Sequence, residues 1–134
     1  MTTQAFEQTN RIIRELKTNG IIIQRYNATT GSVYLKLDYG VLNSIRIADH
    51  PGKQKLKYRY NVIKGYKGPI ETDMGRRLFY GWDDQSIELL LKQILEDRKY
   101  KMNKYGSSNY LAYMKKNQDE NKNTKGFWQN AKLV

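Results

Sequence analysis

Four short runs of strand-forming residues follow one another between residues 21 and 63, with only tight turns between them. The last three runs alternate apolar and polar residues, as strands with one buried face do. The runs cover residues 21–26, 32–38, 41–48 and 55–63. Antiparallel strands can be joined by such short turns, whereas parallel strands need a crossover of a dozen or so residues. The sequence therefore predicts an antiparallel meander.

Residues with helical periodicity precede and follow this meander. A first helix is predicted over residues 3–18, and Asn19-Gly20 ends it. Its apolar face is expected to consist of Phe6, Ile12, Ile13 and Leu16. A second, longer helix begins after a cap at Asp83 or Asp84. Its apolar stripe contains Ile87, Leu90, Leu91, Ile94 and Leu95.

After Gly106, a cap at Ser107 or Ser108 predicts a short third helix with Tyr110, Leu111 and Met114 on one side. Residues 78–80 are a candidate fifth strand. The predicted fold class is α+β: a four- to five-stranded antiparallel sheet with one N-terminal helix and one long plus one short C-terminal helix packed on one face. We expect a single domain over residues 1–117. Residues 118–134 are predicted to be a polar, flexible tail in which Phe127 and Trp128 dock.

The balance of charge indicates the kind of partner. The chain of 134 residues has 24 Lys and Arg against 13 Asp and Glu, a net charge of +11. The excess is concentrated in residues 46–77 and 98–125. A domain this basic is expected to attract nucleic acid, an anionic membrane surface or an acidic protein. The alternative is codon bias in an AT-rich genome, which would enrich Lys, Asn, Ile and Tyr without any ligand.

Several classes of site are excluded by composition. The chain has no Cys, which excludes disulfides, thiolate metal sites and cysteine nucleophiles, and its one His excludes a histidine-rich zinc site within one chain. The longest apolar runs have only three residues, at 21–23 and 89–91. The N-terminal residues lack the features of a signal peptide. We therefore expect a cytoplasmic protein with no membrane association.

The face of the sheet away from the helices is the first candidate site. If Val33, Leu35, Ile45, Ile47, Leu56, Tyr58 and Tyr60 point into the core, the opposite face carries Tyr34, Lys36, Arg46, Lys57 and Arg59. Basic side chains can contact phosphates, and an aromatic side chain can stack on a base. These residues are the predicted nucleic-acid site. The alternative is a solvated sheet face.

The second basic segment interleaves lysines with tyrosines near the end of the long helix. Lys99, Lys101 and Lys104 are predicted to extend the nucleic-acid footprint. The alternative is that the tyrosines complete the core, which we favour for Tyr110, and that the lysines only keep the surface solvated. A pocket between sheet and helix would have tyrosine-rich walls, which suit nucleotides.

Aromatic residues outside the regular pattern support a different class of function. Tyr66, Phe79, Phe127 and Trp128 are candidate partner-binding residues, since aromatic anchors dominate interface energetics. In that alternative the protein is an inhibitor or adaptor that binds a host protein.

Enzymatic function has weaker support. Asp49 and His50 are adjacent in a turn, where neighbours rarely face each other as a catalytic dyad requires. Glu71 and Asp73, in a glycine-rich loop over residues 64–76, could bind Mg²⁺ for phosphodiester cleavage, but no third ligand accompanies them. The glycines of this loop could also cradle an anion, although they lack the GK[ST] ending of a P-loop. We expect no cofactor and no enzymatic activity.

The stretches GSVYLKL, SIRIADH and LKYRYNV, followed by DDQSIELLLKQILED, resemble small basic proteins that phages and mobile elements of low-GC bacteria encode. The resemblance is one of style over residues 1–115, without a defining motif. It implies a regulator that binds DNA or RNA, or an inhibitor of a host function such as a CRISPR effector. We therefore expect a non-enzymatic protein that acts by occupancy on nucleic acid or on a nucleoprotein complex. An exposed edge strand would also permit a dimer.

Overall fold

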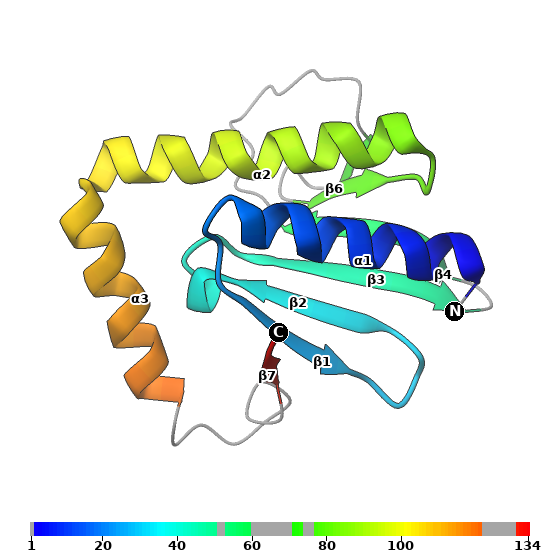
Figure 1. Ribbon diagram of the computed structural model, residues 1–134, viewed down its shortest axis with the longest axis horizontal. Coiled ribbons are helices and arrows are strands. Elements are labelled where there is room, and N and C mark those ends of the chain that lie inside the picture. Colours follow the sequence, from blue (N-terminus) through cyan, green and yellow to red (C-terminus); the bar gives the residue numbers. More distant parts are fainter. Residues whose placement is uncertain (1, 51–52, 60–70, 74–76, 122–130) are drawn as a thin grey trace.

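The computed structural model describes residues 2–50, 53–59, 71–73, 77–121 and 131–134 (Figure 1). Within these ranges the chain has the predicted α+β fold. The helices are α1 (Thr3–Thr18), α2 (Asp84–Tyr105) and α3 (Ser107–Asn121), with a short 3-10 helix, η1 (Asp38–Gly40). The strands are β1 (Ile23–Asn27), β2 (Val33–Leu37), β3 (Ser44–His50), β4 (Lys53–Arg59), β5 (Glu71–Asp73), β6 (Arg77–Tyr80) and β7 (Lys132–Leu133).

All of these strands form one antiparallel sheet in the order β5-β6-β4-β3-β2-β1-β7. Strands β1 to β4 are the predicted meander, and β6 is the predicted fifth strand. Strand β5 lies in the segment predicted to be a loop, and β7 lies in the predicted tail. The prediction of four to five strands missed both, because strands of three and two residues are too short to show alternation.

Helices α1 and α2 lie side by side across one face of the sheet, and the core fills the space between the two layers (Figure 1). Alternate strand residues face the helices and are buried, among them Leu35, Ile45, Ile47, Leu56 and Tyr58. The predicted stripe of α2 is buried or packed against this core. Phe6, predicted for the apolar face of α1, is instead 54% exposed. Its neighbour Ala5 is buried in its place, because consecutive residues on a helix point about 100° apart.

The helix ends follow the local signals in the sequence. The Asp83 carboxylate caps α2 by accepting a hydrogen bond of 3.1 Å from the Ser86 amide. Beyond α1, Gly20 has a φ of +80°, and Gly106, between α2 and α3, has a φ of +86°. Glycine adopts this left-handed backbone without the steric penalty of a side chain. Gly106 therefore allows the chain to change direction between α2 and α3.

Helix α3 differs most from its prediction. It runs through Asn121, past the predicted start of the tail at residue 118. The polar residues past this point lie on a largely exposed helix, where a polar sequence does not distinguish helix from coil. Instead of lying across the sheet, α3 packs against η1 and the end of α2 (Figure 1).

The strand boundaries differ from the prediction by a few residues. Strand β1 begins at Ile23, and η1 separates β2 from β3. Strand β3 continues to His50 and β4 begins at Lys53, so Asp49 and His50 lie on a strand and not in the predicted turn. Tyr60, predicted for the core, lies outside the described residues.

Candidate binding surface

The face of the sheet opposite the helices carries a row of aromatic and basic side chains. Backbone register pairs Tyr26 with Tyr34, Tyr34 with Arg46, Arg46 with Lys57, and Lys57 with Phe79. Directly paired residues of an antiparallel sheet lie on the same face. The row therefore crosses β1, β2, β3, β4 and β6. All five side chains are partly exposed, and we call this row the outer face.

Cation–π and aromatic contacts organise the outer face. The Arg46 guanidinium carbon lies 5.7 Å from the centroid of the Tyr34 ring. The rings of Tyr26 and Tyr34 are 6.3 Å apart. The Lys55 ammonium lies 5.5 Å from the centroid of Phe79. Such contacts hold long side chains over a flat surface while their charged groups remain near solvent.

The guanidinium group of Arg46 has a hydrogen-bond partner at Nη2 but none at Nε. Its Nη2 donates to the Ser32 hydroxyl at 3.5 Å, and that hydroxyl is 3.1 Å from Nε2 of His50. The Arg46 Nε is buried and has no hydrogen-bond partner. The guanidinium is therefore positioned, but its capacity to donate hydrogen bonds is only partly used.

Lys36 lies in a different environment from the other predicted phosphate contacts. Its residue exposure is only 9%, and burial lowers the pKa of its ammonium group. A Cβ built on Gly40 would lie 2.9 Å from the Lys36 Cε, so the Lys36 stem is packed against η1. Lys36 is therefore less accessible to a ligand than Arg46 or Lys57.

Two further predicted sites, Arg59 and the pair Glu71 and Asp73, lie toward the β5 edge of the sheet. Arg59 ends β4 opposite Arg77 of β6. The acidic positions Glu71 and Asp73 pair in register with Phe79 and Arg77, so they are confined to the edge strand β5. On the middle strands β2, β3 and β4, the outer face consists of Tyr34, Arg46 and Lys57, and none of these residues is acidic.

Of the predicted partner-binding residues, Phe79 lies on the outer face, beside the predicted nucleic-acid residues. Tyr66, Phe127 and Trp128 lie outside the described residues.

The second basic segment is not continuous with the outer face, because α2 lies on the other side of the sheet. Lys99 and Lys104 are exposed there, and the Lys104 ammonium lies 5.6 Å from the centroid of Tyr105. Lys101 turns inward instead. Its ammonium donates to the Val41 carbonyl at 2.9 Å and lies 3.7 Å from the Asp97 carboxylate. Lys101 thus holds α2 to the segment after η1.

The sequence did not predict the buried polar cluster that lies at the corner between η1, α2 and α3. Asp38 is fully buried, and its Oδ2 accepts hydrogen bonds from Nε of Arg98 at 2.8 Å and from the Tyr110 hydroxyl at 2.6 Å. Its Oδ1 accepts from the Ile22 amide at 3.0 Å. Burial, together with the nearby Asp38 carboxylate, raises the pKa of Tyr110 well above its ordinary value. Tyr110 is buried, as favoured from the sequence.

A second buried carboxylate lies beside the first cluster. Asp97 is 3% exposed and accepts a hydrogen bond of 2.7 Å from the Tyr58 hydroxyl. Burial raises the pKa of Asp97 and lowers the pKa of its neighbour Lys101. One feature of the sequence indicated these clusters. Asp38 stands at the start of the tight connection between β2 and β3, where a carboxylate often accepts hydrogen bonds from backbone amides.

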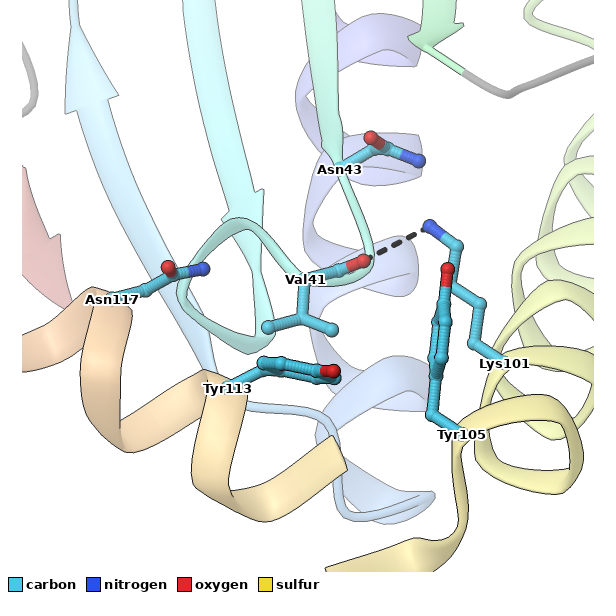
Figure 2. A pocket seen from close by; sticks show the side chains of 6 residues that line it. All are labelled: Val41, Asn43, Lys101, Tyr105, Tyr113 and Asn117. Carbon is cyan, nitrogen blue, oxygen red and sulfur yellow. Dashed lines mark hydrogen bonds between the residues drawn. The ribbon is translucent and has the colours of Figure 1, made fainter. Parts of the chain in front are cut away.

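The same corner contains the pocket shown in Figure 2. Its volume is about 420 Å³, and it is lined by Val41, Asn43, Lys101, Tyr105, Tyr113 and Asn117. The rings of Tyr105 and Tyr113 meet edge to face, 5.6 Å apart at 84°. The sequence indicated only that a pocket between sheet and helix would have tyrosine-rich walls; the tyrosine-lined pocket of the structure lies where α2 and α3 meet η1.

The candidate enzymatic residues are separated. Asp49 accepts a hydrogen bond from the Thr2 amide next to α1, whereas His50 contacts Ser32 on the other face of the sheet. Consecutive strand residues point to opposite faces, so these two cannot act as a dyad. Among the residues that the structure describes, no three His, Cys, Asp or Glu residues are close enough to hold a metal ion.

Comparisons with known proteins give no relative for this chain: no family model, no curated protein and no solved structure matches it. None of the described helices is both long and apolar enough to cross a lipid bilayer.

Proposed function

We propose that this protein is a non-enzymatic binding protein whose outer face occupies a single-stranded segment of nucleic acid. The observation that carries the proposal is the row of Tyr26, Tyr34, Arg46, Lys57 and Phe79 across five neighbouring strands. Adjacent strands are about 4.8 Å apart, so the row is about 19 Å long. Open antiparallel sheets with exposed aromatic residues are a recurrent platform for two or three stacked bases.

The chemistry of the row supports a nucleic acid over a simple anion. Arg46 and Lys57 supply positive charge, and Tyr34 and Phe79 supply ring surfaces beside them. Phosphates contact the cations while bases stack on the rings, so one ligand uses both kinds of side chain. The net charge of +11 would further speed the encounter with a polyanion.

Occupancy of nucleic acid or of a nucleoprotein complex would suit a regulator, or an inhibitor of a host defence, as the resemblance to phage and mobile-element proteins implies. On this proposal Arg46, Lys57 and Tyr34 bind the ligand, with Arg59 and Lys36 at its margins. Lys99 and Lys104 would then contact a second segment of the ligand, and Lys101 would act only through the structure.

The test is a titration of the nuclease-treated protein with fluorescent single- and double-stranded DNA and RNA over a series of salt concentrations. We expect the single strands to bind more tightly, with a log–log salt slope of about −0.7 for each phosphate contacted. Weak binding, equal for all four ligands and lost at physiological salt, would contradict the proposal. A protein partner recognised through exposed aromatics would then be the better explanation.

A matched pair of variants locates the site. Arg46→Glu with Lys57→Glu should weaken binding by at least about tenfold, or ~1.4 kcal/mol, because both cations of the row become anions. The control, Arg14→Glu with Lys92→Glu, changes net charge equally on exposed positions of α1 and α2. Equal weakening by both double variants would show that only net charge matters and would exclude the outer face as the site.

A further inference from the structure

The pocket at the corner of η1, α2 and α3 has walls suited to a flat ligand. Tyr105 and Tyr113 are exposed, at 39% and 46%, and their rings meet edge to face. Figure 2 shows the Tyr113 ring below Val41 and the Tyr105 ring to its right, with Asn43 and Asn117 further out. A planar ligand can stack on one ring and meet the edge of the other.

The turn that borders the pocket contains residues with a left-handed backbone and is held by side chains of α2 and α3. Asp38 and Tyr39 have φ values of 47° and 54°, and Asn43 has a φ of 74°. Asp and Asn adopt a left-handed backbone more readily than other side chains, whereas at Tyr39 this backbone costs about 1–2 kcal/mol. The turn is maintained by the Arg98–Asp38 ion pair and by the bond of 3.0 Å from Asn117 Nδ2 to the Tyr39 carbonyl. Strain maintained in this way is concentrated at binding sites in proteins.

The polar groups of the pocket favour a neutral ligand with donors and acceptors on its edge. The positive charge of Lys101 is compensated by Asp97, 3.7 Å away, so the pocket offers a phosphate no net charge. Asn43 Nδ2 is buried without a hydrogen-bond partner, and the amide of Asn117 uses one donor on Tyr39. Amide side chains match the donor and acceptor pattern of a nucleobase edge.

The rim of the pocket has the charge that its interior lacks. The Lys104 ammonium lies 5.6 Å from the centroid of Tyr105, a lining residue of the pocket. A base in the pocket would therefore place its sugar and phosphate toward solvent, near this ammonium group.

We propose that this pocket binds one unstacked nucleobase of a nucleotide, stacked on one of the two rings, Tyr105 or Tyr113, with its edge toward the other ring and the amides of Asn43 and Asn117. The site is separate from the outer face and does not depend on it. The same chemistry is offered by a free mononucleotide and by one nucleotide of a strand.

The test is an NMR titration of the isotope-labelled full chain with AMP, GMP, CMP and UMP, and with ribose 5-phosphate as the matched ligand without a base. We expect at least one nucleotide to shift the backbone amides of residues 41–43, 101–105 and 113–117 in a saturable manner, with a Kd of about 1 mM or tighter. Ribose 5-phosphate should leave these amides unshifted. Equal shifts with ribose 5-phosphate, or no shift there with any nucleotide, would overturn the proposal.

Variants of the two wall residues give a second readout. Tyr105→Ala and Tyr113→Ala should each weaken nucleotide binding by at least about fivefold, since stacking of a base on an aromatic ring supplies ~1–3 kcal/mol. The control is Tyr100→Ala on α2, which is 58% exposed and also lies beside Lys104 but does not line the pocket. Equal weakening by Tyr100→Ala would contradict the assignment.

A single-stranded oligonucleotide distinguishes the two sources of the base. Tighter binding of the oligonucleotide than of the mononucleotide at the same amides would identify a strand as the ligand, and the reverse order would identify a free nucleotide. Both results support the pocket. The double variant Arg46→Glu, Lys57→Glu should leave mononucleotide binding unchanged, so the pocket and the outer face can succeed or fail separately.

Discussion

The outer face and the corner of η1, α2 and α3 are built from the same residue types but use them in opposite ways. On the outer face, Arg46 and Lys57 are partly exposed and lie beside aromatic rings. At the corner, Arg98 and Lys101 are turned inward toward the buried carboxylates of Asp38 and Asp97. The charge of the first region is directed outward to solvent, and that of the second holds the fold together.

The difference comes from desolvation. A buried cation is tolerated only beside an anion and with its hydrogen bonds satisfied, and removal of either partner leaves an uncompensated charge. A partly exposed cation keeps most of its hydration and contributes little to stability. Substitutions at the corner should therefore change stability, and those on the outer face should change binding.

The largest expected effect is at Asp38. Asp38→Asn leaves the Arg98 guanidinium without its anion and should lower the free energy of unfolding by about 3–5 kcal/mol. Urea unfolding followed by circular dichroism measures it. The control is Asp84→Asn, whose side chain is 83% exposed and which should cost at most ~1 kcal/mol. A loss below that value at Asp38 would mean that the buried pair is not what holds the corner.

The next effect concerns Tyr110 and pH. Because its pKa is raised in the folded state, the folded chain keeps the phenol proton at a pH where the unfolded chain releases it. Its contribution to stability is therefore complete below the ordinary tyrosine pKa of about 10 and is lost progressively as the pH rises above it. Tyr110→Phe should cost about 1.5–3 kcal/mol at neutral pH, since the bond to a charged group is lost.

Tyr110→Phe should also make the fall of stability above pH 10 shallower, which unfolding curves recorded from neutral to alkaline pH would measure. Tyr100→Phe, on the exposed side of α2, is the matched control. An unchanged alkaline slope in Tyr110→Phe would contradict the buried environment assigned to this phenol.

Two lysines allow the most direct comparison of the regions. Lys101→Met removes the cation beside Asp97 and should destabilise the chain by about 1–3 kcal/mol. Lys57→Met should alter stability by no more than ~0.5 kcal/mol and should weaken oligonucleotide binding. Thermal unfolding and fluorescence titration of the two variants measure both quantities. Equal changes in stability and in oligonucleotide affinity for the two variants would contradict the distinction between a stabilising corner and an outer face that binds.

The smallest effect concerns the turn that borders the pocket. Gly40 and Gly31 have nearly equal φ values of +90° and +92°, but a Cβ at Gly40 would meet Lys36 at 2.9 Å, and one at Gly31 would meet nothing within 4 Å. Both Gly→Ala changes should cost about 1–2 kcal/mol for the backbone, and Gly40→Ala somewhat more because the packed stem of Lys36 must move. Equal losses in urea unfolding would show that this stem is loosely held.

The fold was largely predictable because its signals are local. The alternating pattern of residues 32–38 and 41–48 predicted two strands, and the stripe from Ile87 to Leu95 predicted a long helix. Tyr34, Arg46 and Lys57 were placed on one face because alternation fixes the side of each residue. Strands β5 and β7 could not be predicted, since pairing with a neighbouring strand, rather than a pattern of their own, defines them.

Local patterns did not predict which charged residues are exposed and which are turned into the core. Lys99, Lys101 and Lys104 are close in the sequence and of one type, and only the position of η1 turns Lys101 inward. The pairing of Asp38 with Arg98 and Tyr110 joins residues 60 and 72 positions apart. No local pattern contains that information.

Local patterns in the sequence predicted the α+β class, the meander, the ends of α1, the start of α2 and the side of the sheet on which the basic residues lie, because periodicity and capping act over a few neighbouring residues. Long-range packing decides which charges are buried, where the tyrosine pocket forms and how α3 packs. Those properties depend on how far each group is removed from water, and that is set by segments distant in the sequence.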